Sequence, residues 1–247
     1  MIKRKIFGLL MAPPFKTVAE NHKILSDNLS QAWKSKSLPA RQWKLVEPQL
    51  VDFEKGLPCQ EFLIFLKAID ACCAAMANSP QSLLEIGCSS GYYGHVLKSK
   101  FPDIKYTGVD YSESFINFGK LKYPLFDLRV GDTTNLIFKD QEFEIAVSGC
   151  VLLHVYDWKL GVQEACRVAN NFVIFHRTPV TESATTLLKK RGYLKKMVEW
   201  AFNEQEFIST VNSSGFKHLQ SLTIHDDIIL GTDPKKAVPI TYIFQRT

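Results

Sequence analysis

The stretch from Leu83 to Gly94 constrains the fold more than any other part of the chain. It reads Leu-Leu-Glu-Ile-Gly-Cys-Ser-Ser-Gly-Tyr-Tyr-Gly, an apolar run that ends in an acidic residue and a glycine-rich turn. The segment that follows, His95–Lys98, can begin a helix. A strand, a glycine turn and a helix in this order bring backbone N–H groups and a helix N-terminus close to a ligand, because glycine leaves room where a side chain would block the approach.

Two cofactor classes use this arrangement, and the glycine spacing separates them. The dinucleotide fingerprint needs Gly at the first, third and sixth positions. Counted from Gly87, these positions hold Gly87, Ser89 and Tyr92, so the last two do not match. The other pattern, acidic-x-Gly-x-x-x-Gly, is met by Glu85, Gly87 and Gly91. The stretch alone leaves open an ordinary strand-to-helix turn in some other α/β protein.

From Gln81 onward, short apolar runs alternate with helical segments, which is typical of a doubly wound sheet. We therefore expect an α/β protein with a Rossmann-like, seven-stranded, mostly parallel sheet. Asn203 and Glu206 form a capping box, which predicts a helix ending near Gly215. The expected strands are Ser82–Ile86, Tyr106–Asp110, Leu128–Val130, Glu144–Ser148, Phe172–Phe175, about Leu219–His225 and Ile240–Gln245, and the other expected helices are Ser114–Lys120, Trp158–Val168 and Thr185–Ala201.

The N-terminal part carries few strand signals. We expect residues 1–80 to form a helical cap and residues 81–247 to form the main domain. A mostly buried helix should run from Phe62 through Ala77 and stop before Pro80. The polar, aromatic-rich stretch before it contains Trp33 and Arg41. This stretch either packs its tryptophans on the core or forms a lid, in which case Trp33 and Arg41 contact the substrate.

In its Glu85–Gly91 motif, the chain resembles the class I S-adenosylmethionine-dependent methyltransferases, with Ser89 where many members carry a third glycine. The resemblance covers about residues 81–175 and implies S-adenosylmethionine as the cofactor. In the family, an acidic residue after the third strand meets the adenine amino group, which implies that role for Asp132. A turn aspartate is the alternative, because Gly-Asp is common in loops. Ser148–His154 resembles the family's loop beside the methionine part of the cofactor.

Asp110 ends the second expected strand, about 20 residues past the glycine turn, where an acidic residue can accept hydrogen bonds from both ribose hydroxyls. The alternative is that Asp110 caps the next helix, but Ser112 is well placed to do so. Tyr92, and Tyr93 beside it, can line the methionine pocket or simply pack the turn. The full predicted cofactor set is Glu85, Gly87, Cys88, Gly91, Tyr92, Asp110, Tyr111, Asp132, Thr133 and Cys150.

A sulfonium methyl group is already activated, so the protein mainly has to align donor and acceptor and exclude water, and no metal is expected. A hydroxyl or amine acceptor benefits from a general base, and histidine titrates in the useful range. His154 and His176 both follow expected strands, and both are predicted as catalytic residues. We assign His176 to the acceptor side, where Arg177 can hold an anionic group, and His154 to shaping the loop. Packing of His154, and strand-end hydrogen bonding by His176 and Arg177, are the alternatives.

The function expected from these residues is methyl transfer to a small-molecule or saccharide-like biosynthetic acceptor, with O-methylation favoured. Methylation of RNA or protein is one alternative. It is disfavoured because the chain shows no appended RNA-binding module and no Asn/Asp-Pro-Pro-Tyr/Phe/Trp run. A non-catalytic protein that binds S-adenosylmethionine is the other alternative. Nucleic acid is not an expected partner, and the oligomeric state is not predicted.

The composition fits this class. The chain has 247 residues, of which 46% are apolar and 22% charged, as in soluble globular proteins, and no apolar run is long enough for a transmembrane helix. Six cysteines without paired metal spacing or a dense disulfide framework favour free thiols in a reducing cytoplasm. The net charge of +5 is modest. Its clearest cluster, Lys189-Lys190-Arg191 with Lys195-Lys196, is expected on a solvated helix face.

Overall fold

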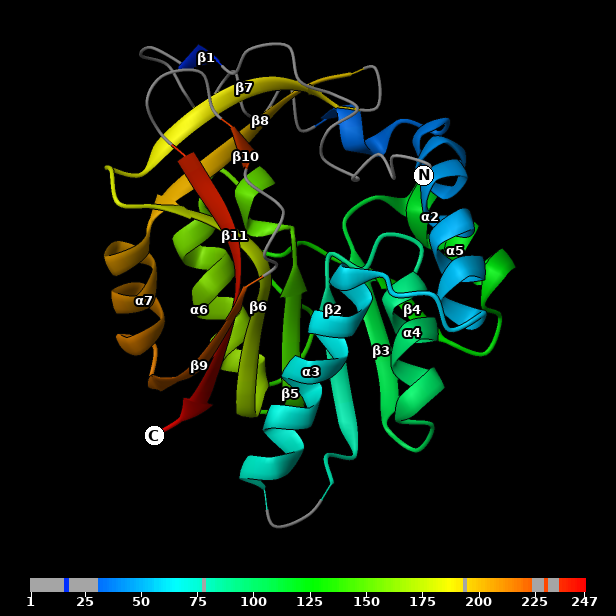
Figure 1. Ribbon diagram of the computed structural model, residues 1–247, viewed down its shortest axis with the longest axis horizontal. Coiled ribbons are helices and arrows are strands. Elements are labelled where there is room, and N and C mark those ends of the chain that lie inside the picture. Colours follow the sequence, from blue (N-terminus) through cyan, green and yellow to red (C-terminus); the bar gives the residue numbers. More distant parts are fainter. Residues whose placement is uncertain (1–15, 18–30, 77–78, 193–194, 224–228, 231–235) are drawn as a thin grey trace.

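The computed structural model describes residues 16–17, 31–76, 79–192, 195–223, 229–230 and 236–247. The described strands form one eleven-stranded sheet, and seven of them make its central part (Figure 1). In spatial order these seven are β4 (Asp127–Val130), β3 (Lys105–Asp110), β2 (Ser82–Ile86), β5 (Phe143–Gly149), β6 (Ala169–Thr181), β11 (Lys236–Arg246) and β9 (Phe216–Thr223). The strands β2 to β6 of this sheet are parallel, and β11 lies antiparallel between β6 and β9. The predicted Rossmann-like, mostly parallel sheet is confirmed.

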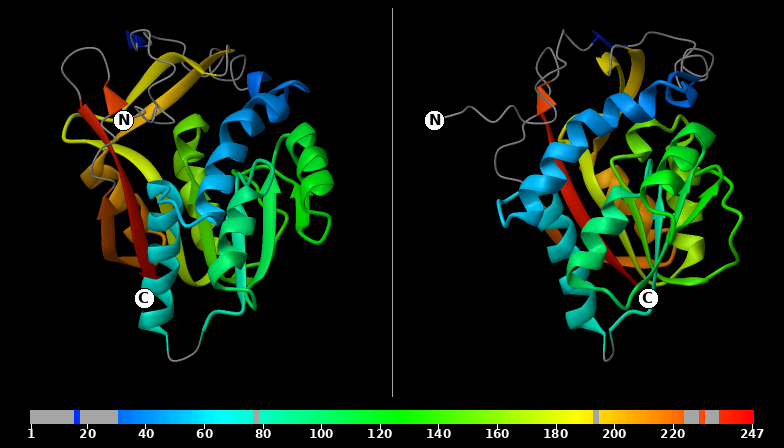
Figure 2. Two further views of the ribbon diagram at one scale, coloured as in Figure 1. Left: turned by 45° about the vertical axis from the view of Figure 1, so that its right-hand side comes forward. Right: turned by 90° about the vertical axis from the view of Figure 1, so that its right-hand side faces the viewer.

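Helices cover both faces of this sheet (Figures 1 and 2). Successive residues of a strand point to opposite faces, so Leu83 and Leu84 belong to two different buried clusters. Because both faces are covered, the central strands are apolar almost throughout, which is why they are legible in the sequence. The cluster of Leu83 includes residues of α3 (Gln60–Ala75), α4 (Tyr92–Lys100) and α5 (Glu113–Lys122). The cluster of Leu84 includes residues of α6 (Trp158–Val168) and α7 (Glu204–Asn212).

The predicted capping box is confirmed at the start of α7. The Asn203 side-chain oxygen accepts a hydrogen bond from the Glu206 backbone N–H at 2.9 Å. The helix ends before Gly215, whose φ of 84° is the left-handed conformation that glycine adopts readily.

The prediction of a helix over Thr185–Ala201 is wrong. This segment forms an antiparallel hairpin of β7 (Thr186–Gly192) and β8 (Lys195–Asn203), and β8 pairs with the end of β6. Gly192 weakens a helix interior by about 1 kcal/mol, and tertiary pairing overrides the helix preference of the Leu and Lys residues around it. The expected helix face therefore does not exist; the side chains of residues 189–196 lie outside the described ones. Two short strands, β1 (Lys16–Thr17) and β10 (Ile229–Leu230), pair with β7 and β11.

The N-terminal part contributes η2 (Gln31–Lys34), α2 (Leu38–Glu54) and α3, which confirms the predicted long helix before Pro80. Phe62 and Phe65 of α3 are buried in the same cluster as Leu83 of the sheet. Therefore α3 shares one core with the main domain, and the boundary at residue 80 stays a prediction. Residues 1–15, 18–30 and 77–78 of the predicted cap lie outside the described residues.

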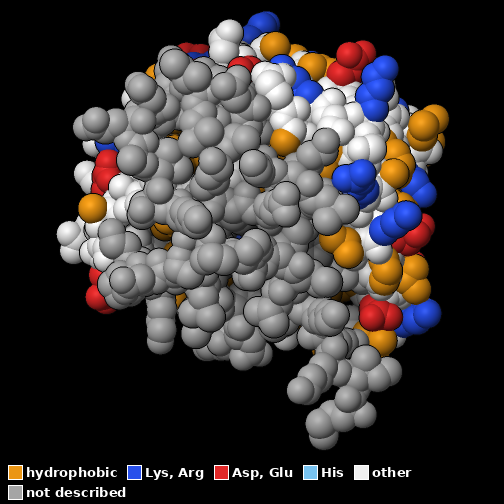
Figure 3. All heavy atoms as spheres, turned by 90° about the horizontal axis from the view of Figure 1, so that it is seen from above, with side chains coloured by type: hydrophobic (Ala, Val, Ile, Leu, Met, Phe, Trp, Pro, Cys, Tyr) orange, Lys and Arg blue, Asp and Glu red, His pale blue; other side chains and the backbone are white. Residues whose placement is uncertain are grey.

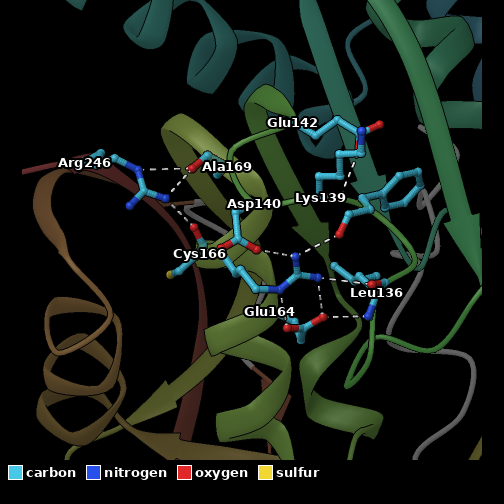
Figure 4. A network of polar contacts seen from close by, with 10 residues as sticks. Leu136, Lys139, Asp140, Glu142, Glu164, Cys166, Ala169 and Arg246 are labelled. Carbon is cyan, nitrogen blue, oxygen red and sulfur yellow. Dashed lines mark hydrogen bonds and ion pairs between the residues drawn. The ribbon is translucent and has the colours of Figure 1, made fainter.

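Two arginines tie the lower ends of the elements together (Figure 4). The Arg167 guanidinium pairs with Glu164 at 2.6 Å and Asp140 at 2.8 Å, and it donates to the carbonyl oxygens of Leu136 and Phe138. Glu164 also accepts the Leu136 N–H. Together these bonds fix the connection between β4 and β5 on α6. Arg246 of β11 donates to the Cys166, Ala169 and Asn170 carbonyls, where α6 passes into β6.

In the part of the chain that the structure describes, no helix has the length and apolar character needed to span a membrane. Viewed from above, the described surface on the side of α2 and α5 mixes basic, acidic and hydrophobic side chains (Figure 3).

Candidate active site

The turn after β2 has the backbone that the glycine pattern predicts. Gly87 and Gly91 have φ values of 72° and 78°, and Ser89 between them has a φ of 53°. A Cβ at Gly87 would lie 2.2 Å from a methyl carbon of Val151, in the loop after β5. The N–H groups of Gly87 and Cys88 both donate to the Val109 carbonyl, at 2.7 and 3.0 Å. The turn is therefore clamped between β3 and the loop after β5.

Asp110 at the end of β3 holds two loops at once. One carboxylate oxygen accepts the Ser89 N–H and the other accepts the Ser112 N–H, each at 2.9 Å. Burial raises the pKa of Asp110 to about 6, although these two backbone bonds lower it. Ser112 is the N-cap residue of α5 but makes no side-chain capping bond. Each oxygen of Asp110 keeps a second lone pair, so the carboxylate can still accept hydroxyl donors from a ligand.

Glu85 lies beneath the turn and is almost completely buried. Its carboxyl accepts the Tyr106 hydroxyl at 2.5 Å. Burial raises the pKa of Glu85 to about 8, although the Tyr106 bond lowers it. Cys88 packs against Gly108 of β3, and burial raises the pKa of its thiol well above the usual range. We call the Glu85–Gly91 turn, together with the Asp110 carboxylate that binds it, the cradle. Glu85 and Cys88 lie on the core side of the cradle and support it there.

The N-terminal elements touch this cradle through three serine hydroxyls. The Ser89 hydroxyl donates to the Gln42 side-chain oxygen of α2. The Ser112 hydroxyl donates to the Trp33 carbonyl at 2.9 Å, and the Ser114 hydroxyl reaches the Ser35 carbonyl at 3.5 Å. In addition, Lys34 lies 5.3 Å from the centre of the Tyr111 ring. The segment of η2 and α2 (blue in Figures 1 and 2) therefore rests on the loops that end β2 and β3.

Asp132 and Thr133 lie at the end of β4. Asp132 is exposed, and one of its oxygens accepts both the N–H and the hydroxyl of Thr134 at 2.8 Å. This is the geometry of a turn aspartate, and it leaves the second oxygen of Asp132 for a ligand. The methyl group of Thr133 would lie 3.1 Å from a Cβ at Gly161 of α6. Both residues lie on the same edge of the sheet as Asp110.

Cys150 follows β5, and Arg177 lies within β6, just past the part that pairs with β5. Both have a φ of 58°, which is strained for residues with a side chain. The Cys150 N–H donates to the His176 carbonyl at 2.9 Å. In β6 the pairing with β11 is irregular, since His176 and Arg177 together lie opposite Thr241. Such a bulge redirects a side chain, and bulges are common beside active sites.

His176 is 1% exposed, and both of its ring nitrogens have partners. Nε2 lies 3.1 Å from the Tyr93 hydroxyl, and Nδ1 lies 2.9 Å from the Thr241 hydroxyl. Burial, with the charge of Arg177, lowers the pKa of His176 well below its usual range. These contacts favour the alternative of strand-end hydrogen bonding for His176, because both ring nitrogens already have partners; its role as the acceptor-side base stays a prediction.

His154 lies in η3 (Leu152–His154), under the N-terminal segment. Its Nδ1 lies 3.0 Å from the Val198 carbonyl, which can only accept, so Nδ1 carries a proton. Nε2 lies 3.6 Å from the buried Glu199 carboxylate. The Trp33 ring packs on the imidazole at 4.7 Å between centroids. The structure therefore brings the predicted residues His154 and Trp33 together, beside a carboxylate that the sequence did not single out.

Two further predicted residues, Tyr92 and Arg41, lie on the helices α4 and α2. Tyr92 begins α4 with its ring 4.8 Å from that of Tyr93, and its place in the methionine pocket stays a prediction. Arg41 is exposed on α2, and its substrate role stays a prediction. Among the described residues, no group of three or more His, Cys, Asp or Glu side chains is placed to hold a metal ion. The structure adds Gln42, Glu199 and Thr241, whose roles depend on contacts far apart in the sequence.

Comparison with known proteins gives one consistent result. Residues 84–174 match the family described as "Methyltransferase domain". The demethylmenaquinone methyltransferase of Desulfitobacterium hafniense is 26% identical over 164 residues, which is 62% of this chain and 52% of that protein. This chain therefore spans about half the length of that relative.

Solved structures share the fold at low sequence identity. An S-adenosylmethionine-dependent methyltransferase from Clostridium acetobutylicum superposes with a TM-score of 0.56 at 12% identity, over 82% of this chain and 98% of that one. CalS10 from Micromonospora echinaspora, an amino pentose methyltransferase solved with S-adenosylmethionine bound, gives 0.53 at 12% identity, over 80% and 96%.

The fold and the cradle are those of a Rossmann-like domain that binds an adenosine-containing cofactor. With residues 84–174 matching the methyltransferase-domain family, the chain is similar in sequence and fold to class I S-adenosylmethionine-dependent methyltransferases, and S-adenosylmethionine is the cofactor of those proteins. The residues present fit it, because Gly87 and Gly91 give the turn the backbone conformation of the glycine pattern and Asp110 can accept hydroxyl donors.

Proposed function

We propose that this protein transfers the methyl group of S-adenosylmethionine to a hydroxyl of a small molecule, of the class of saccharide-like biosynthetic intermediates. The observation that carries the proposal is the cradle itself, in which the Glu85–Gly91 turn and the Asp110 carboxylate are joined by the Ser89 N–H at 2.9 Å. Solved structures of this fold include an amino pentose methyltransferase and a sugar N-methyltransferase, which supports the acceptor class. Because all six cysteines are free, we also place the protein in the cytoplasm.

The cofactor, when bound, supplies a methyl group activated by the sulfonium. The chain's own task is to align the acceptor with this group and to keep water out. Asp110 accepts the ribose hydroxyls, and the η2–α2 segment covers the loops beside it through Ser89 and Ser112. Residues of this segment, Trp33 above all, then face the acceptor from the side opposite the cradle.

We assign the general base to His154 in place of His176. In the neutral ring, the lone pair on Nε2 can take the proton of an acceptor hydroxyl, and the Glu199 carboxylate at 3.6 Å stabilises the imidazolium that results. Trp33, packed on the ring, orients it. His176 instead fixes the bulge that carries Arg177, through its bonds to Tyr93 and Thr241.

The test measures S-adenosylhomocysteine released by the full chain from S-adenosylmethionine with a panel of hydroxylated small molecules and sugars. RNA and protein substrates are separate arms. We expect turnover with a small molecule and binding of S-adenosylmethionine but not NAD. Asp110→Ala should weaken cofactor affinity by about 2–3 kcal/mol, because charge-assisted hydrogen bonds are lost. Binding of NAD alone, or retention of the cofactor with no product in any arm, contradicts the proposal.

Once an acceptor is known, His154→Ala should lower turnover by about 10²–10⁴-fold at unchanged cofactor affinity, as expected for loss of a general base. Glu199→Gln should give a smaller loss. If His154→Ala turns over normally, alignment alone carries the reaction and the base assignment fails.

A further inference from the structure

Arg177 is a partly buried cation, and the described residues provide no ion-pair partner for it. Its Nε atom is shielded from solvent and has no hydrogen-bond partner. Among the residues that the structure describes, no carboxylate lies within 4.0 Å of its guanidinium. Partial removal of a charge from water is unfavourable unless the charge is paired. A negatively charged group placed against Arg177 would therefore stabilise this position.

The groups around Arg177 do not neutralise its charge. Burial lowers the pKa of the guanidinium, but Cys150, Tyr93, Glu61 and Tyr92 raise it to a net increase. Burial also raises the pKa of Tyr93, so its hydroxyl is uncharged. Glu61, in the first turn of α3, is the only carboxylate among these groups, and it is not at ion-pair distance. Arg177 thus stays fully charged in a setting that favours a further negative partner.

The backbone holds Arg177 in this position at a cost. Its φ of 58° is a strained conformation, and its N–H donates to the Thr241 hydroxyl at 3.3 Å. The same hydroxyl bonds His176, whose other nitrogen bonds Tyr93 of α4. Strained residues persist where the surrounding structure fixes them, and they cluster at ligand sites. The bulge, His176 and Tyr93 together hold the backbone of Arg177 in place.

Arg177 and the residues that hold it lie apart from the cradle. Arg177 follows the β5-paired part of β6, one strand beyond β5 and two beyond β2. Ligands of open α/β sheets bind at the carboxyl ends of the strands, so Arg177 lies on the ligand edge, on the side away from Asp110 and Asp132. Tyr92 and Tyr93, which influence its pKa, begin α4 at the other end of the cradle turn.

We propose that Arg177 binds a carboxylate or phosphate group of the methyl acceptor, which makes the acceptor an anionic small molecule. This rests on the proposed function and adds the acceptor's charge to it. The guanidinium presents parallel N–H donors that match the oxygens of such groups, and these charge-assisted pairs are strong in a desolvated site. The carboxylate of the cofactor's methionine part has the same chemistry, so the test must separate the two sources.

The experiment uses the full chain saturated with S-adenosylhomocysteine, titrated with inorganic phosphate and with propionate by calorimetry. We expect at least one of the two anions to bind the wild type. Arg177→Gln should weaken this binding by about 10- to 100-fold, and Arg177→Lys by less, because lysine keeps the charge but not the fork. Arg129→Gln is the control. It removes an equal charge from β4, where Arg129 pairs with Asp127 on the surface, and should leave anion binding unchanged.

A second titration compares S-adenosylhomocysteine with 5′-methylthioadenosine, which lacks the amino-acid part. If Arg177→Gln weakens only S-adenosylhomocysteine, and neither anion binds the saturated wild type, Arg177 serves the cofactor and the proposal is overturned. Unchanged anion binding in Arg177→Gln overturns it as well. If the wild type binds no S-adenosylhomocysteine at all, the proposed function has failed instead. Wild-type affinity for 5′-methylthioadenosine in both Arg177 variants shows that they are folded.

Discussion

The two halves of the ligand edge are built in opposite ways. On the cofactor side, two buried carboxyls, Glu85 and Asp110, are each hydrogen-bonded to groups of the fold. On the acceptor side, a neutral histidine and an unpaired arginine replace them. The first half is complete without a ligand, since its shape comes from backbone bonds. Among the described residues, none pairs with Arg177 as an anion. We therefore propose that the backbone turn recognises the cofactor and that a few side chains recognise the acceptor.

The largest difference between the halves should come from Gly87→Ala. The new methyl group would lie 2.2 Å from Val151 in addition to the cost of a φ of 72°. We expect a loss of more than about 3 kcal/mol in cofactor binding, because either the turn or the loop after β5 must move. Calorimetry with S-adenosylhomocysteine measures this. Gly215→Ala is the matched control, since its φ is 84° but no atom lies within 4 Å of the added methyl. Equal affinities of the two variants would contradict the steric argument.

An intermediate effect is expected from pH, with opposite signs for the two halves. Burial raises the pKa values of Glu85 and Asp110 to about 8 and about 6, so the native protein holds protons that the unfolded chain has already released. Their contribution to stability is present below pH 4 and is lost as the pH rises toward 8. His176 has a lowered pKa, so its contribution is present above about pH 6.5 and is lost as the pH falls. Each proton bound or released on unfolding changes the slope of the free energy of unfolding against pH by at most about 1.4 kcal/mol per pH unit.

Urea unfolding without cofactor, between pH 5 and 8, measures these slopes. Glu85→Gln should remove most of the decline in stability above pH 6, and His176→Gln should remove the decline below pH 6.5. Cofactor affinity should decrease below about pH 6, as Asp110 becomes protonated and loses its role as an acceptor. A wild-type stability that rises steadily up to pH 8, with no change in Glu85→Gln, would show that the carboxyls are ionised in the fold.

The smallest effect is expected at the contact between the N-terminal segment and the cradle. Gln42→Ala removes the partner of the Ser89 hydroxyl and should weaken cofactor binding by about 0.5–1.5 kcal/mol. Gln205→Ala, at an exposed position of α7, is the control. Because Gln42 touches only the cofactor half, anion binding near Arg177 should not change. A change there would mean that the segment couples the two halves.

Much of the fold could be read from the sequence because local and tertiary preferences agree. The strands are covered on both faces and are therefore continuous apolar runs, and Asn203 with Glu206 marks a helix start unambiguously. The β7–β8 hairpin was missed because the helix preference of its Leu and Lys residues disagrees with its pairing. Only contacts with β6 and η3 decide that disagreement, and these are invisible to a local pattern.

The site shows the same limit. The glycine turn and Asp110 lie in one contiguous pattern, so the cofactor half was legible. The roles of the histidines were not, because their partners are distant along the chain. The Tyr93 and Thr241 hydroxyls lie 83 and 65 positions from His176, and the Val198 carbonyl lies 44 from His154. A histidine that follows a strand can act as a general base or can fix the neighbouring backbone through hydrogen bonds, and only these contacts distinguish the two roles.

The position of β11 has a consequence for biosynthesis. This strand pairs with β6 along most of its length, and Arg246 near its end bonds to the carbonyls where β6 begins. During translation, β2 to β6 of the sheet leave the ribosome well before residue 246. Until then β6 presents an open edge of N–H and C=O groups flanked by apolar side chains, the kind of edge that recruits strands from other chains. We therefore expect β6 to need protection from such pairing until residues 236–246 have been synthesised.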